Sequence, residues 1–241
     1  MIELSIIIPV FNEERKVVKD INEAVKFFND QKIRGEIMMV DDGSRDRSVA
    51  FAQEAAVGKD YEISIISNNV NRGKGYSVRQ GMLKARGQYV MFADSGYCIR
   101  YEYALKALEL LKKDACDIVH GSRKLPQSVI KISQPIVRRI CSRAFRLYTI
   151  IFMGLPGFLT DTQCGFKVYK REAARKLYSE SLTDGFTFDI DIILRALRNK
   201  YRIVEIPVEW SCDYDSRIKV FLMARRIIAE FAKMKKDLFK V

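Results

Sequence analysis

Two carboxylates stand side by side at Asp41 and Asp42, directly before Gly43 and Ser44. Adjacent like charges are costly unless each meets a hydrogen-bond donor or a cation. One interpretation is that they contact the base or ribose of a nucleotide. The other is a turn in which an aspartate caps the helix expected from Arg47. The residues alone favour neither interpretation.

A glycine-rich basic string, Asn71-Arg-Gly-Lys-Gly75, offers a place for phosphate. Its two glycines let a ligand approach the backbone, and Lys74 can meet a diphosphate. The spacing is that of neither a Walker loop nor a dinucleotide fingerprint. A glycine turn with a solvated lysine is therefore the alternative.

A further carboxylate, Asp94, follows an apolar run and precedes a serine and a glycine. Such a group can hold a divalent metal that neutralises a leaving diphosphate, or it can belong to a plain strand-end turn. The polar string Asp161–Lys167 interrupts apolar segments later in the chain, and its Asp161 and Gln163 offer hard oxygen ligands.

The segments between these strings alternate between β-branched runs and amphipathic helical patterns. We expect strands at residues 4–10, 36–40, 63–67, 89–93, 118–121 and 202–210, and helices at 12–29, 47–57, 75–85, 101–112, 184–199 and 217–241. This alternation predicts a doubly wound, mostly parallel α/β sheet. Ligands of such sheets bind at the carboxyl ends of the strands. We therefore predict that residues 9–13, 41–44, 71–75 and 94–96 converge in one crevice.

The bulk composition indicates one domain over residues 1–241, of which 48% are hydrophobic. The five cysteines have no metal-ligand spacing, which favours reduced thiols in the cytosol. The single histidine, His120, is expected to be structural. No signal-peptide pattern is present, and the longest apolar stretch, Leu147–Leu159, is too short and too broken by glycine and proline to span a bilayer.

The formal net charge of +12 points to a polyanionic partner. Basic residues recur at helical spacing beside apolar ones in two places, at 138–146 and 217–226. A solvated helix face, an anionic membrane surface and a nucleic acid all remain open as explanations. No nucleic-acid-binding motif is recognisable, so we expect no nucleic acid partner.

Taken in order, the strings resemble glycosyltransferase family 2, and within it the dolichyl-phosphate glucosyl- and mannosyltransferases. The resemblance covers residues 4–219, and it is carried by the strings Pro9-Val-Phe-Asn-Glu13, Asp41-Asp-Gly-Ser44, Asn71-Arg-Gly-Lys-Gly75, Ala85-Arg-Gly87, Gly121-Ser-Arg123, Asp161-Thr-Gln-Cys-Gly-Phe-Lys167, Phe188-Asp189, Ile206-Pro-Val-Glu-Trp210 and Ser216-Arg-Ile-Lys219. The heptapeptide from Asp161 is similar to the glucosyl branch in particular.

The resemblance implies the A-type, Rossmann-like transferase fold and a role for each matching residue. The nucleotide-sugar site would include Pro9, Phe11, Glu13, Asp41, Asp42, Lys74, Gly75, Asp94 and Ser95. The catalytic residues would be Asp94, Arg123, Gln163 and Arg217, with Asp94 and Gln163 as ligands of Mg²⁺ or Mn²⁺. The acceptor phosphate would meet Arg123, Arg138, Arg217 and Lys219.

The implied reaction is transfer of a hexose, with inversion, from a nucleotide sugar to a polyprenyl or dolichyl phosphate at the cytoplasmic face of a membrane. UDP-glucose is the favoured donor, and GDP-mannose is the alternative. Residues 1–125 would bind the donor, and residues 126–241 would face the acceptor and the membrane. We expect peripheral membrane contact through a basic amphipathic C-terminal helix, and a homo-oligomer is possible.

One departure from the family pattern concerns the metal. Gly96 stands where the second aspartate of an Asp-x-Asp motif is expected. Loss of a charged ligand should weaken metal binding. A non-catalytic, membrane-associated nucleotide-sugar-binding protein is therefore the alternative from a different functional class.

Overall fold

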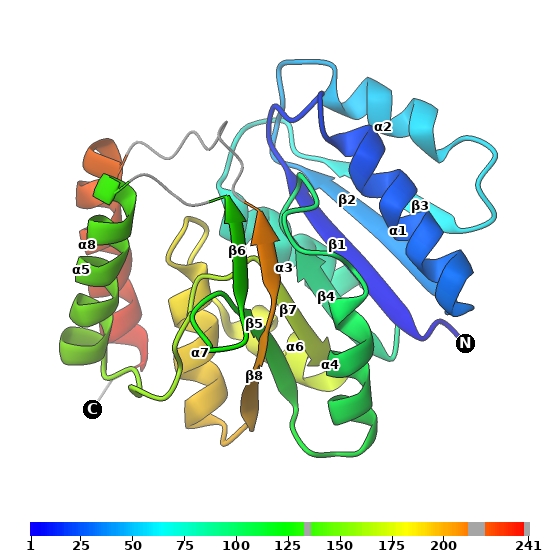
Figure 1. Cartoon of the computed structure of the whole chain (residues 1–241). Helices are drawn as coiled ribbons and strands as arrows, with labels where there is room; N and C mark the ends of the chain where they lie inside the picture. The colour runs from blue at the N-terminus through cyan, green and yellow to red at the C-terminus, as the bar shows by residue number, and fades with distance from the viewer. Residues whose placement is uncertain (133–135, 212–219, 239–241) are drawn as a thin grey trace.

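The computed structural model describes residues 1–132, 136–211 and 220–238, without the side chains of 136–140 and 220–226. Seven strands form one sheet in the order β3-β2-β1-β4-β7-β5-β8 (Figure 1). The bounds of these strands are β1 Leu4–Val10, β2 Gly35–Asp41, β3 Glu62–Ser67, β4 Tyr89–Ala93, β5 Ile118–Ser122, β7 Phe166–Lys170 and β8 Ile203–Pro207. All neighbours pair in parallel except β7, which runs antiparallel to both β4 and β5. The predicted doubly wound, mostly parallel sheet is confirmed.

Helices cover both faces of the sheet. Their bounds are α1 Val17–Gln31, α2 Ser48–Ala56, α3 Lys74–Lys84, α4 Tyr103–Lys112, α6 Arg171–Glu180 and α7 Phe188–Arg198. The two-residue period of β1 sends Ile6 and Ile8 into the core beneath α1 and α4, and Ile7 into the core beneath α3, α6 and α7. A strand buried on both faces explains why β1 reads as a continuous apolar run.

The sequence analysis left residues 122–183 without assigned elements, and the later part of this stretch forms β7 and α6. The polar string before it ends in a short strand whose Lys167 is buried, which hides the strand from any apolar pattern. Because β7 is antiparallel, the residues that precede it lie at the same sheet edge as those that follow β4. The hydrogen bond from Asp94 N to Gly165 O (2.9 Å) joins the two segments there.

The expected last strand, residues 202–210, is two strands in two sheets. β8 ends at Pro207, which cannot donate to a ladder, and β9 Glu209–Ser211 then pairs with β6 Val129–Ile132 in a separate two-stranded sheet. The prediction of one continuous strand was wrong because it ignored the missing proline N–H.

A helical layer closes the far end of the sheet. Figure 1 shows α5 Ile136–Met153 and α8 Val220–Leu238 side by side beyond α7. Phe231 and Met234 of α8 are buried against α5 and α7, and Phe145 of α5 lies 5.8 Å from the Phe231 ring. None of the helices within the described residues combines the length and hydrophobicity needed to cross a bilayer.

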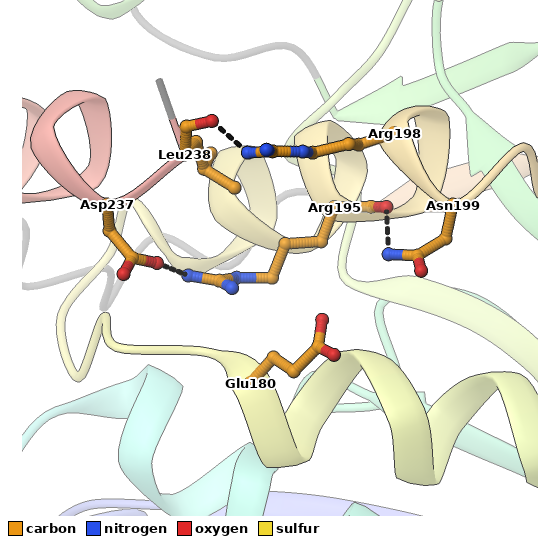
Figure 2. Close-up of a pocket in the computed structure, with 6 residues that line it drawn as sticks. All are labelled: Glu180, Arg195, Arg198, Asn199, Asp237 and Leu238. Carbon is orange, nitrogen blue, oxygen red and sulfur yellow. Dashed lines mark hydrogen bonds and ion pairs between the residues drawn. The ribbon is translucent and has the colours of Figure 1, made fainter. Parts of the chain in front are cut away.

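A polar pocket of about 320 Å³ marks the joint between α6, α7 and α8 (Figure 2). Arg195 is buried at its wall and pairs with both Asp191 (2.8 Å) and Asp237 (2.7 Å). Arg198 donates to the Leu238 carbonyl. Because the Arg195 charge is already balanced by two carboxylates, this pocket serves to attach α8 to α7.

Candidate active site

A second pocket, of about 350 Å³, opens at the carboxyl ends of β1, β2 and β3. It is lined by Phe11, Asn12, Gly43, Ser44, Arg45, Asn68, Asn69, Val70 and Asn71. Two of its loops interlock, because Asn12 N donates to Ser44 Oγ (2.7 Å) and Arg45 N donates to Asn12 Oδ1 (2.8 Å). The sequence analysis named Phe11 as a site residue but missed Arg45 and Asn68. A single polar residue outside a motif does not indicate whether it will line a pocket.

The adjacent carboxylates Asp41 and Asp42 are both buried at the rim of this pocket. Asp41 accepts the backbone N–H of Ser44 (3.1 Å), which shapes the turn after β2. Asp42 accepts the N–H groups of Arg72 (2.9 Å) and Gly73 (2.8 Å). Asp42 thereby holds the glycine-rich string directly before α3, so two of the predicted segments do converge.

Lys74 opens α3 and joins that string to β4. Its Nζ lies 2.6 Å from Asp94 Oδ1 and near the ring centres of Phe92 (5.9 Å) and Phe188 (5.8 Å). Burial works to lower the pKa of Lys74, but the charges of Asp94 and Asp189 outweigh it and the pKa is raised. Lys74 is therefore a fixed cation at the carboxyl edge of the sheet.

Asp94 is held against Gly165 of the heptapeptide. A Cβ at Gly165 would lie 2.1 Å from both Cγ and Oδ2 of Asp94, far inside ordinary contact. Only glycine leaves room for the carboxylate in this position. The heptapeptide thus shapes the site because Gly165 leaves the space that the Asp94 carboxylate fills. It also carries the half-buried Gln163 two residues earlier.

The surroundings of Asp94 fit a divalent ion that arrives with phosphate. In the part of the chain that the structure describes, Asp94 Oδ1 is shielded from solvent and accepts no hydrogen bond of regular geometry. Its only ion-pair partner among these residues is Lys74. Nowhere in residues 1–132, 136–211 and 220–238 do three or more histidine, cysteine or acidic side chains converge. One carboxylate completed by substrate phosphates and water is a usual way for proteins to bind Mg²⁺.

The turn after Asp94 is tied to α1 by Asp20. Ser95 Oγ donates to Asp20 Oδ2 (2.6 Å), and Gly96 N donates to Oδ1 (2.9 Å). Burial raises the pKa of Asp20 to about 6, against these two hydrogen bonds. Gly96 has φ +100°, a conformation that disfavours aspartate. The sequence analysis missed Asp20, although an acid within the apolar stripe of a helix was an available signal.

Arg123 follows β5 and is fixed by Asp161. Its Nε and Nη2 donate to the two Asp161 oxygens (2.6 and 2.8 Å), and its guanidinium lies 5.2 Å from the Trp210 ring. Burial opposes the charge of Arg123, yet Asp161 raises its pKa, and Asp94 adds to the effect. Arg123 follows β5 and Asp94 follows β4, and because these two strands run the same way, both residues lie at one sheet edge. The carboxylate of Asp161, considered above as a metal ligand, is committed to Arg123.

A buried ion pair lies behind these residues. Lys167 bonds Asp189 at the start of α7 and donates to Thr162 O (2.8 Å). Burial raises the pKa of Asp189 despite the Lys167 charge. His120, on the neighbouring strand, is buried, and neither of its nitrogens has a hydrogen-bond partner among the residues that the structure describes. Burial lowers the pKa of His120 well below the usual value. A neutral core histidine is the structural role that the sequence predicted.

The other predicted residues take varied positions. Pro9 lies in β1, Gly75 is buried in α3, and Glu13 pairs with Lys16 at 2.7 Å. Arg217 and Lys219 lie outside the described residues, and Arg138 belongs to α5 without a described side chain. The site that the structure assembles therefore contains Asp42, Lys74, Asp94 and Arg123 at one sheet edge.

A sequence profile described as glycosyl transferase family 2 matches residues 5–178. The chain belongs to glycosyltransferase family 2. It is 31% identical over 234 residues to a dolichyl-phosphate beta-glucosyltransferase of Trichomonas vaginalis, covering 93% of this chain and 71% of that protein. It is 32% identical over 223 residues to the enzyme of that name from Saccharomyces cerevisiae, covering 86% of this chain and 66% of the yeast protein.

Solved structures confirm the fold of this family 2 glycosyltransferase. Glucosyl-3-phosphoglycerate synthase from Mycobacterium tuberculosis, in complex with Mn²⁺, UDP and glucosyl-3-phosphoglycerate, superposes with a TM-score of 0.70 at 18% identity. The superposition covers 96% of this chain and 79% of that one. The synthase in complex with Mg²⁺ and UDP gives the same TM-score at 17% identity.

Proposed function

We propose that this glycosyltransferase transfers glucose, with inversion, from UDP-glucose to dolichyl or another polyprenyl phosphate at the cytoplasmic face of a membrane. The observation that carries the proposal is that Lys74, paired with Asp94, and Arg123, paired with Asp161, place two cations and a carboxylate at the edge where such sheets bind ligands. The names of the relatives support glucose as the sugar and dolichyl phosphate as the acceptor.

The pocket lined by Phe11 and Asn68 would hold the nucleoside, and Lys74 would meet its diphosphate. Asp94, with Gln163 as a further oxygen ligand, would hold Mg²⁺ or Mn²⁺. Such an ion supplies electrostatic stabilisation of the departing diphosphate. Lys74 would add a second positive charge that is already in place, and preorganised charge of this kind is usually the largest contribution to such catalysis.

The acceptor explains why no acid–base pair is needed. A phosphate monoester has its second pKa at about 6, so it is already a nucleophilic anion near neutral pH. Arg123, fixed by Asp161 at the same sheet edge as Asp94, would hold that anion near the donor. Arginine suits this work because its planar fork binds phosphate in two places. Arg138, Arg217 and Lys219 remain predictions for the same role.

An exposed apolar surface lies close in the chain to Asp161, the residue that fixes Arg123. We call it the α5 patch, and it consists of Leu147 (58% exposed), Ile151 (62%), Phe152 (55%) and Phe158 (65%). Arg146 Nη2 fixes its loop by donating to Gly157 O (3.0 Å) and Leu159 O (3.2 Å). Phe158 lies three positions before Asp161 in the chain, a span of at most about 11 Å between their Cα atoms. A lipid phosphate would therefore find an apolar surface and a fixed arginine close together.

The decisive experiment incubates the purified full chain with dolichyl phosphate, Mn²⁺ and either labelled UDP-glucose or labelled GDP-mannose. We expect a glucosylated lipid from the first donor and no product from the second. A variant at an exposed and distant position, Lys106→Ala, serves as the control and should retain activity. A mannosylated lipid would contradict the choice of sugar.

One observation favours a second candidate. Gly96 leaves Asp94 without the second carboxylate that the family pattern carries, and the Gly96 N–H is bound to Asp20. A protein that binds UDP-glucose without turnover is therefore the alternative function. Donor binding in calorimetry, together with no glycolipid from either donor, would select it.

A further inference from the structure

The Lys74–Asp94 ion pair joins the two groups that the proposed function assigns to different parts of the donor complex. Lys74 would meet the diphosphate, and Asp94 would hold the metal. Yet Lys74 Nζ lies 2.6 Å from Asp94 Oδ1, so the lysine already balances the charge that a metal would use. Two cations on one carboxylate repel each other, so each weakens the binding of the other.

Asp94 carries one negative charge for both cations, and one side of its carboxylate is closed. Gly165 packs directly against its Cγ and Oδ2, leaving no space even for a Cβ on that side. Position 96, where the family pattern carries a second aspartate, is a glycine in this chain, and its N–H donates to Asp20. A single negative charge, confined from behind, therefore faces Lys74.

Within residues 1–132, 136–211 and 220–238, the other acid that acts on the charge of Lys74 is already paired. It is Asp189, which is buried and bonded to Lys167. Rings of Phe92 and Phe188 line the rest of the surroundings of Lys74. If a metal displaced Lys74 from Asp94, the ammonium group would lose its ion pair in a largely buried place, which is unfavourable unless a new anion arrives.

We propose that Lys74 acts as a resident counter-cation on Asp94 and yields this carboxylate to a divalent ion only when a nucleoside diphosphate gives the lysine a new anionic partner. The inference rests on the proposed function, because it requires a donor diphosphate at this edge. Its consequence is that metal and nucleotide bind with positive cooperativity, and that the coupling depends on Lys74. By linkage, each ligand raises the affinity for the other by the same factor.

The test is a calorimetric cycle on the full chain. Mn²⁺ is titrated with and without saturating UDP into the wild type, Lys74→Met and the control Lys84→Met, which removes an exposed lysine at the other end of α3. In the wild type, UDP should raise the Mn²⁺ affinity at least about tenfold, or about 1.4 kcal/mol. In Lys74→Met, Mn²⁺ alone should bind more tightly than to the wild type, and the coupling should fall at least about fivefold. Lys84→Met should match the wild type.

The other outcomes distinguish failure of the counter-cation role from failure of the proposed function. Unchanged Mn²⁺ affinity in Lys74→Met, with UDP bound normally by the wild type, would overturn the counter-cation role and leave the proposed function standing. No UDP binding by the wild type with or without Mn²⁺ would overturn both. If Lys74→Met fails to fold, Lys74→Gln takes its place, and absence of coupling in the wild type alone already contradicts the inference.

Discussion

Gly165→Ala should disable the site without unfolding the protein. The new Cβ would lie 2.1 Å from Asp94 Cγ, whereas ordinary contacts begin near 3.4 Å, so the carboxylate must shift by more than 1 Å. That shift breaks the 2.6 Å pair with Lys74. Misplacing a reacting or coordinating group by about 1 Å costs roughly 100-fold in rate, or about 2.7 kcal/mol of transition-state stabilisation.

The assay is kcat/KM for glucosyl transfer, measured beside the melting temperature. Gly165 has no positive φ, so alanine adds no backbone strain there. The matched control is Gly157→Ala, where an added Cβ meets nothing within 4 Å and φ is also not positive. We expect a loss of about 100-fold in Gly165→Ala and none in Gly157→Ala, with both melting temperatures close to wild type. Wild-type kcat/KM in Gly165→Ala would refute the assigned position and role of Asp94.

Three further predictions concern stability and the membrane. Burial raises the pKa of Asp20 from 3.8 to about 6, so the native state binds the carboxyl proton more tightly than the unfolded state does. The free energy of unfolding of the wild type, relative to that of Asp20→Asn, should therefore fall by up to about 3 kcal/mol as pH rises from 4 to 7. Urea unfolding of both proteins at pH 4 and pH 7 checks the sign, and a wild-type stability that rises with pH relative to Asp20→Asn would contradict the prediction. Asp189→Ala leaves a buried lysine without its counter-ion and should cost about 3–5 kcal/mol in urea unfolding, so a loss below about 1 kcal/mol would argue against the pair. The double change Ile151→Glu and Phe158→Glu should lower the affinity for anionic vesicles, measured by co-sedimentation, about 100-fold or more. The control Leu105→Glu on α4 should bind like the wild type, and equal binding by the wild type, the double variant and the control would exclude the α5 patch.

The α5 patch is a cleaner subject for such a test than the C-terminal helix. Phe231, Met234 and Leu238 of α8 are buried against α5 and α7. Removing α8 would therefore expose a hydrophobic core, and any change in membrane binding would be mixed with unfolding. Surface substitutions on α5 leave that core intact.

The donor half of the molecule was predictable because its signals are local. Buried strands such as β1 read as apolar runs, and in a parallel sheet the loops after them must meet at one edge. That argument alone placed Asp42, Lys74 and Asp94 in one region, and the structure joins them through hydrogen bonds and an ion pair.

The second half depends on contacts that no local pattern carries. The antiparallel β7 contains a buried lysine that pairs with Asp189, 22 residues away, so its polar sequence hid a core strand. The role of Asp161 as the partner of Arg123 likewise requires knowledge that the loop before β7 lies beside the end of β5. Both facts follow from sheet order, which sequence periodicity does not determine.

The most direct test of the account is an experimental structure of the full chain with UDP and Mn²⁺. We predict nucleoside density in the pocket beside Phe11 and Asn68, diphosphate oxygens within hydrogen-bonding distance of Lys74, and the ion on Asp94. Nucleotide bound at another surface, such as the pocket between α6, α7 and α8, would contradict the central claim that the carboxyl edge of the sheet grips the donor.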